Sequence, residues 1–124
     1  MTTIDVKKMA AQGDVLFRRL RSKKIPEGYA EVKRPGPLVV AHSETGHHHT
    51  AEASPHGELR CYENPADPLV CYLQMGGEAV DFTVTHHRPY DTHEPLRCLG
   101  KPGDVWQVRR QREHTPEGWR RVQD

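Results

Sequence analysis

The sequence has few of the features that identify a disulfide-linked, membrane-spanning or secreted protein. Its 124 residues include only three cysteines, at positions 61, 71 and 98, and no Cys-x-x-Cys pair, so we expect free thiols that pack as small apolar groups. No apolar run approaches the roughly 20 residues of a membrane span, and the first ten residues lack a signal-peptide core. These absences predict a cytoplasmic protein.

The chain also has almost no excess of charge of one sign, and it has few aromatic residues. Eighteen lysines and arginines oppose 17 aspartates and glutamates, for a net charge of +1, and aromatic residues make up 6% of the chain. A balanced total provides no overall attraction for a polyanion. Basic residues nevertheless cluster at 18–24 and 109–112. Such runs fit solvated strand faces or, as a weaker alternative, a nucleic-acid-binding β-barrel.

Long periodic helices are absent, and short extended segments separated by turns take their place. Ten prolines and ten glycines interrupt the chain. The clearest strand pattern covers residues 79–86, where Val80, Phe82 and Val84 alternate with polar residues. About nine short strands are expected, which predicts a single all-β domain over residues 1–124, either a small barrel or a sandwich with little helix. Residues 1–11 could form an N-terminal arm.

Histidine is the most informative residue type that is present. Nine histidines occur in the chain, four of them between positions 42 and 49. Imidazole is the commonest metal ligand in proteins, and on an extended segment His47 and His49 share a face. Zinc needs three or four such ligands, and non-haem iron needs two histidines and a carboxylate. The candidate metal ligands are His42, Glu44, His47, His49, His87 and His93.

Two other interpretations of the histidines remain open, namely a hydrogen-bonded structural cluster and an anion-binding or pH-sensing site. No Gly-x-Ser-x-Gly turn or phosphate-binding glycine loop points to a particular reaction. Tryptophan supplies core or subunit-contact anchors rather than base-stacking platforms. The candidate residues for contacts with a partner are Arg109, Arg110, Arg112, Trp106 and Trp119.

Two motifs partly resemble those of cupins, which are small double-stranded β-barrels with a histidine-rich metal site. His47-x-His49 is similar to the first cupin motif, and Gly103-Asp104 followed by His114 is similar to the second. The chain departs from the pattern where Arg110-Gln-Arg112 replaces a Pro-x-Gly and where Glu52 follows the histidines too closely. The resemblance implies a metal held by His47 and His49 with His114 or Glu44.

From Gln12 onward the chain also resembles a group of small, uncharacterised bacterial and phage-encoded β proteins. The most specific shared pieces are Thr45-Gly-His-x-His49 and Arg110-Gln-Arg-Glu113, followed by Pro116-Glu-Gly118. This resemblance implies a compact β domain with a histidine-containing hairpin, and it implies no established activity.

Two functions from different classes follow from these patterns. The first is a non-enzymatic binding or structural domain whose histidine cluster holds a metal ion such as zinc or iron, or an internal hydrogen-bond network. Such a domain would act with protein partners, as a homo-oligomer or as a subunit of a larger assembly such as a phage virion. The second is a small cupin-like metal-dependent enzyme or small-molecule binder, with an open coordination position for its substrate. We favour the first and leave enzymatic activity uncertain.

Overall fold

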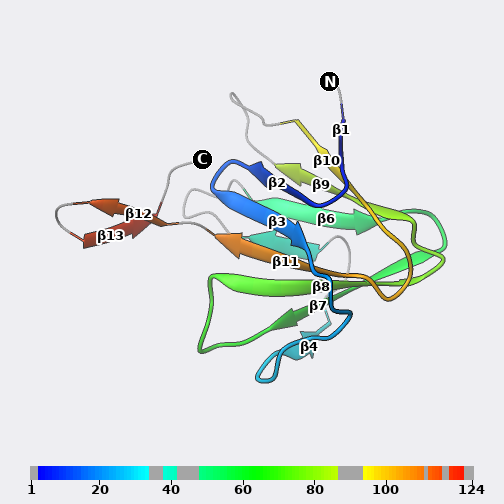
Figure 1. The fold of residues 1–124 in the computed structure, drawn as a ribbon, viewed down its shortest axis with the longest axis horizontal. Coiled ribbons are helices and arrows are strands. Elements are labelled where there is room, and N and C mark those ends of the chain that lie inside the picture. The colour runs from blue at the N-terminus through cyan, green and yellow to red at the C-terminus, as the bar shows by residue number, and fades with distance from the viewer. Residues whose placement is uncertain are drawn as a thin grey trace.

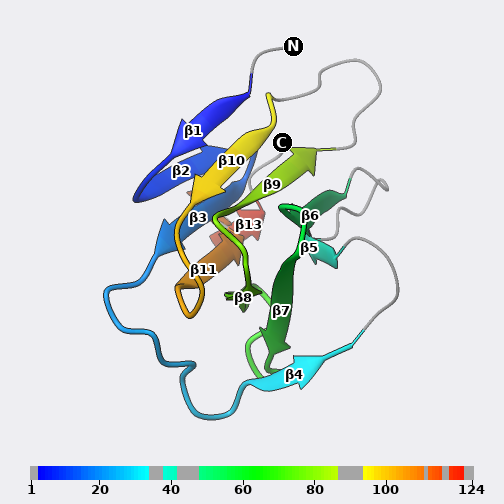
Figure 2. The same ribbon diagram turned by 90° about the vertical axis from the view of Figure 1, so that its right-hand side faces the viewer.

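The protein is a two-layered β-sandwich (Figures 1 and 2). The computed structural model describes residues 3–33, 38–41, 48–86, 94–110, 112–115 and 118–121; for residue 41 and the last two ranges it describes the backbone only. No helix occurs within these ranges, so none of them contains a helix able to cross a membrane. The all-β prediction is confirmed, and of its two forms the sandwich is the one observed, since neither sheet closes into a barrel.

The first layer, sheet A, has five strands in the order β1-β10-β9-β6-β5. Its central strands are joined by antiparallel pairing, while β1 runs parallel to β10. The pairing of β6 with β9 sets His49 directly opposite His86. The strand bounds are β1 Ile4–Val6, β5 Leu38–Ala41, β6 His49–Ala53, β9 Asp81–His86 and β10 Leu96–Leu99.

The second layer, sheet B, has six strands in the order β2-β3-β11-β8-β7-β4, all antiparallel. The strand bounds are β2 Met9–Gln12, β3 Val15–Arg19, β4 Ala30–Val32, β7 Gly57–Glu63, β8 Val70–Gly77 and β11 Val105–Arg110. The strands β12 (Arg112–Thr115) and β13 (Gly118–Arg121) form a separate two-stranded sheet.

The hydrophobic core lies between the two sheets. Phe82 of sheet A packs edge-on against Trp106 of sheet B, with ring centroids 5.5 Å apart, and neither side chain is exposed to solvent. Cys61, Cys71 and Cys98 are buried and free, which confirms that they pack as small apolar groups. Burial also raises the pKa of the Cys98 thiol to about 12.

A smaller apolar cluster covers the outer face of sheet B. The connection from β3 to β4 contributes Leu20, Ile25 and Tyr29, which pack against Tyr72 and its neighbours. Tyr29 meets Tyr72 edge-on at 4.8 Å and donates a hydrogen bond of 2.6 Å to Asp67. Because both faces of sheet B are covered, β8 reads as a continuous apolar run rather than an alternating one.

The N-terminal segment differs from its prediction. Residues 4–6 and 9–12 are strands β1 and β2, and Val6 is buried in the core, so this region belongs to both sheets and is no free arm. The predicted strand at 79–86 also begins later than expected. Val80 precedes β9 and is 59% exposed, whereas Phe82, Val84 and His86 form the buried face.

Candidate functional site

The candidate site lies at the end of the sandwich where β6 begins and β9 ends, called the histidine end below. The start of β6 and the end of β9 lie toward the left of Figure 1. In the chain, the connection 42–47 comes before β6 and the connection 87–93 follows β9. Both connections lie outside the described residues. They contain five of the six predicted metal ligands, namely His42, Glu44, His47, His87 and His93.

His49, the sixth predicted ligand, is 1% exposed and faces the interior. Its Nδ1 lies 2.9 Å from Oε1 of Gln12, a buried residue at the end of β2. The Gln12 amide nitrogen donates to the carbonyl oxygens of Val84 (3.1 Å) and Glu94 (3.0 Å). These two acceptors fix the orientation of the amide, so its oxygen faces the ring and the His49 Nδ1 carries the proton. In the neutral ring, Nε2 is then the atom that can accept a hydrogen bond or bind a metal.

Gln12 therefore ties the two sheets together at the histidine end. It belongs to sheet B. Its three polar contacts reach β6 and β9 of sheet A, and Glu94, which lies two residues before β10. Val84 and Glu94 lie on either side of the connection 87–93, and His49 follows the connection 42–47. The buried Gln12 side chain thus links residues that flank both histidine-bearing connections in the chain.

His86 lies across the strand pair from His49 and is fully buried. The two imidazoles are stacked, with centroids 4.0 Å apart and planes within 4° of parallel. A metal ion must lie close to the plane of each imidazole that binds it, at about 2.1 Å from the nitrogen. One ion cannot lie in two stacked parallel planes, so this arrangement is a packed ring pair and not a joint chelate.

The described residues also hold no group of three or more histidine, cysteine, aspartate or glutamate side chains arranged for a metal ion. A complete metal site would therefore need ligands from outside the described ranges. His49 is the one predicted ligand that lies among the described residues, and its Nε2 is the ring nitrogen suited to bind a metal ion. Gln12 supplies the kind of hydrogen bond that usually orients a metal-binding imidazole.

A buried ion pair lies beside this network. Asp14, which is 1% exposed, lies in the turn between β2 and β3, and its carboxylate lies 3.7 Å from the Arg110 guanidinium. Sequence analysis missed both Gln12 and Asp14. They flank Gly13, whose φ of 63° makes a tight turn, and polar residues beside a turn glycine are normally interpreted as exposed.

The predicted partner-binding residues fall into different environments. Arg109 is exposed, Arg110 is held by Asp14, and Trp106 is fully buried in the core, where it offers no indole surface to a partner. Arg112 and Trp119 lie in β12 and β13, whose side chains are outside the described part of the structure.

Comparisons with known proteins identify the family without an activity. No curated protein and no solved structure shows significant similarity to the chain. A family model, described as a domain of unknown function (DUF8820), matches residues 11–111. The match begins beside Gln12 and ends just after Arg110, so it includes both buried polar contacts of the histidine end. The chain therefore belongs to this family, DUF8820.

Proposed function

We propose that the protein is a non-enzymatic binding domain whose ligand binds at the histidine end. The observation that carries this proposal is the buried hydrogen-bond network of Gln12, whose partners flank the two histidine-bearing connections in the chain. Burying an amide and an imidazole is costly unless they are hydrogen-bonded, and the contacts between Gln12 and His49 provide such bonds. Such a network is suited to presenting the residues of two adjacent connections in a fixed relation.

The proposed ligand is a divalent metal ion, zinc or iron. His49 would bind it through Nε2, because its Nδ1 is held by Gln12. The remaining ligands would come from His42, Glu44, His47, His87 and His93. His86 would act as the stacking partner that keeps the His49 ring in place. An ion enclosed in this way would cross-link two connections of the sandwich and so have a structural role.

A protein partner completes the proposal. We infer that the domain works as a homo-oligomer or as a subunit of a larger assembly, such as a phage virion, with Arg109 among the contact residues because it is exposed at the end of β11. The alternative of a cupin-like enzyme requires an open coordination position beside converging ligands. No observation on the described residues specifically favours that arrangement, so we place it second.

Metal analysis tests the proposal directly. Protein purified without a tag or chelator is expected to contain about one equivalent of zinc or iron. His49→Ala should lose it, while His56→Asn should keep it. His56 is a matched control because it is exposed, lies in the turn between β6 and β7, and has a φ of 65° that asparagine tolerates.

Two results would contradict the proposal: a wild-type protein without metal, or a His49→Ala variant that keeps its full metal content. Circular dichroism of each variant shows whether it is folded. If His49→Ala does not fold, His47→Ala serves as the second variant, since it removes a proposed ligand and leaves the Gln12 contact in place.

A further inference from the structure

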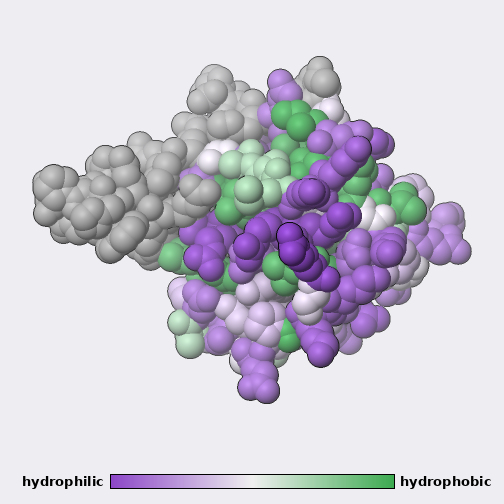
Figure 3. All heavy atoms as spheres, in the orientation of Figure 1, coloured by the Kyte–Doolittle hydropathy of each residue, from purple (hydrophilic) through white to green (hydrophobic). Residues whose placement is uncertain are grey.

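A basic groove lies at the opposite end of the sandwich from the histidines. It is an open depression of about 950 Å³ formed by the β1–β2 turn, the end of β3, the loop after β3 and the β10–β11 turn. Strongly hydrophilic side chains gather over this part of the surface, toward the middle and right of the view (Figure 3). The cationic residues that line it are Lys7, Lys8, Arg18, Arg19, Arg21, Lys23 and Lys101.

The groove concentrates charge that the total conceals. Seven of the 18 lysines and arginines line it, together with one of the 17 carboxylates, that of Asp104. The lining therefore carries a formal charge of +6, and the other residues of the chain together carry −5. A balanced total argues against long-range steering, but it does not argue against a local polyanion site of this strength.

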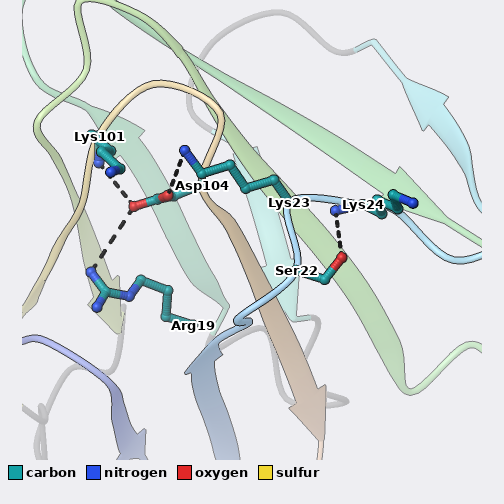
Figure 4. Close-up of polar contacts among 6 residues, drawn as sticks. All are labelled: Arg19, Ser22, Lys23, Lys24, Lys101 and Asp104. Atoms are coloured by element: carbon teal, nitrogen blue, oxygen red, sulfur yellow. Dashed lines mark hydrogen bonds and ion pairs between the residues drawn. The ribbon is translucent and has the colours of Figure 1, made fainter.

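Asp104 organises the centre of the groove, as the close-up shows (Figure 4). Its carboxylate accepts a hydrogen bond of 3.1 Å from the Lys101 backbone N–H, and it lies 4.0 Å from the Arg19 guanidinium and 3.8 Å from the Lys23 ammonium. A Cβ on Gly100 would come within 2.9 Å of this carboxylate, so the turn packs tightly around it. The Asp104 carboxylate thus holds the Arg19 and Lys23 side chains and the Lys101 backbone close together.

Like charges gathered in a groove repel one another, so this arrangement has a cost in the free protein. Scattered cations would provide the same solubility without that cost. The basic side chains come from three separate segments, namely the β1–β2 turn, residues 18–23 and the β10–β11 turn, yet they share one depression. A bound polyanion would relieve the repulsion and neutralise several of them at once.

The shape and composition of the groove distinguish among polyanions. A flat membrane contacts protruding surfaces, and of the large exposed apolar side chains on the described residues only Met9 lines this depression. None of the described residues that line it is aromatic, so this lining provides no platform for stacking unpaired bases. Lysine and arginine without such a platform bind phosphates, which suits the continuous backbone of a duplex.

We propose that the basic groove binds the phosphodiester backbone of duplex nucleic acid without reading its sequence. Lys7, Lys8, Arg18 and Arg21 contact phosphates from the rim, while Arg19 and Lys23 are shared between Asp104 and the ligand. This site is separate from the histidine end, and its function does not depend on metal there.

Fluorescence anisotropy with a labelled DNA duplex of about 20 base pairs tests the proposal. For the wild-type protein, log K is expected to fall steeply with log salt between about 50 and 200 mM. The triple variant Lys7→Gln/Lys8→Gln/Arg21→Gln should weaken binding at least about tenfold and reduce the slope by about 2.7, since each phosphate contact contributes about 0.9.

The matched control is Lys33→Gln/Arg60→Gln/Arg97→Gln, which removes the same charge from exposed positions outside the groove. It should bind DNA like the wild type and have the same salt slope. Equal losses in both triple variants, or a loss in the control alone, would overturn the proposal, the latter by assigning DNA binding to sites outside the groove. Stronger groove-dependent binding to vesicles of anionic lipid than to the duplex would also overturn it, in favour of a membrane surface.

Discussion

The two ends of this sandwich differ in whether their polar side chains are buried or exposed to solvent. At the histidine end Gln12, Asp14, His49 and His86 are all at most 2% exposed, and each contacts an internal partner. At the other end the basic groove leaves its cations in solvent and pairs them loosely with a single carboxylate. The comparison teaches that burial, rather than the number of polar residues, decides whether such a cluster determines stability or remains available for binding.

Two arginine–aspartate pairs, one at each end, test this role of burial most sharply. Breaking the buried pair is expected to have the largest effect on the free energy of unfolding. Arg110 and Asp14 have side chains 11% and 1% exposed, whereas Arg19 and Asp104 have side chains 37% and 10% exposed. Arg110→Ala would remove the guanidinium beside a buried carboxylate and should lower the free energy of unfolding by about 3–5 kcal/mol. Arg19→Ala breaks a more exposed pair and should cost less than about 1 kcal/mol. Urea denaturation of the two variants measures both values, and equal losses would break the comparison.

The alkylation rate of Cys98 provides an independent measure of the difference in stability between the Arg110→Ala and Arg19→Ala variants. Its thiol is buried, with a pKa raised to about 12 in the folded protein, so alkylation at neutral pH requires the protein to open. A loss of about 3 kcal/mol should therefore speed labelling of Cys98 by about 100-fold in Arg110→Ala, since each 1.4 kcal/mol is a factor of ten. Arg19→Ala should label at nearly the wild-type rate, as followed by peptide mass spectrometry.

The next largest effect is expected within the Gln12 network. Gln12→Ala removes three hydrogen bonds and leaves the buried Val84 carbonyl and the partly buried Glu94 carbonyl without this donor, which should cost about 2–4 kcal/mol. The double variant Gln12→Ala/His49→Ala should lose less than the sum of the single variants, with a coupling of about 1–2 kcal/mol. Thermal and urea unfolding give these values. Strict additivity would mean that the Nδ1–Oε1 contact contributes nothing to stability.

Sequence reasoning identified the all-β fold because alternation and turn residues are local signals. Phe82 and Val84 alternate with threonines, and most strands end near glycine or proline. It missed β1 and β2 because Val6 is the only fully buried apolar residue of a three-residue strand, which is too short to show a period of two.

The candidate site was less predictable because its contacts cross between sheets. His49 and His86 are 37 residues apart in sequence, and only the β6–β9 register places them side by side. The partnership of Gln12 with His49 depends on how sheet B lies over sheet A, for which no sequence pattern exists. The same holds for the basic groove, where Lys7 and Lys101 meet only because β1 pairs with β10 and β2 with β3.

Salt should separate the two ends by a smaller effect. Screening weakens repulsion among exposed cations but acts little on buried pairs. Raising the salt concentration from about 50 to 200 mM should therefore stabilise the wild-type protein by a few tenths of a kcal/mol. The Debye length shortens over this range, so the repulsion between neighbouring cations of the groove becomes weaker. The Lys7→Gln/Lys8→Gln/Arg21→Gln variant should gain less than the wild type in the same denaturation series. An unchanged gain would show that the groove is not under electrostatic strain.

The smallest effect is expected from Asp104→Asn, and its sign is what matters. Asparagine keeps an oxygen that can accept the Lys101 N–H, so the turn and the melting temperature should be nearly unchanged. Removing the carboxylate releases Arg19 and Lys23 and raises the formal charge of the lining from +6 to +7. If phosphates compete with Asp104 for these cations, the variant should bind the DNA duplex about two- to fivefold more tightly, since exposed pairs contribute up to about 1 kcal/mol. Weaker binding by a variant that remains fully folded would show instead that Asp104 positions the cations for the ligand, which would make it part of the binding site and not its competitor.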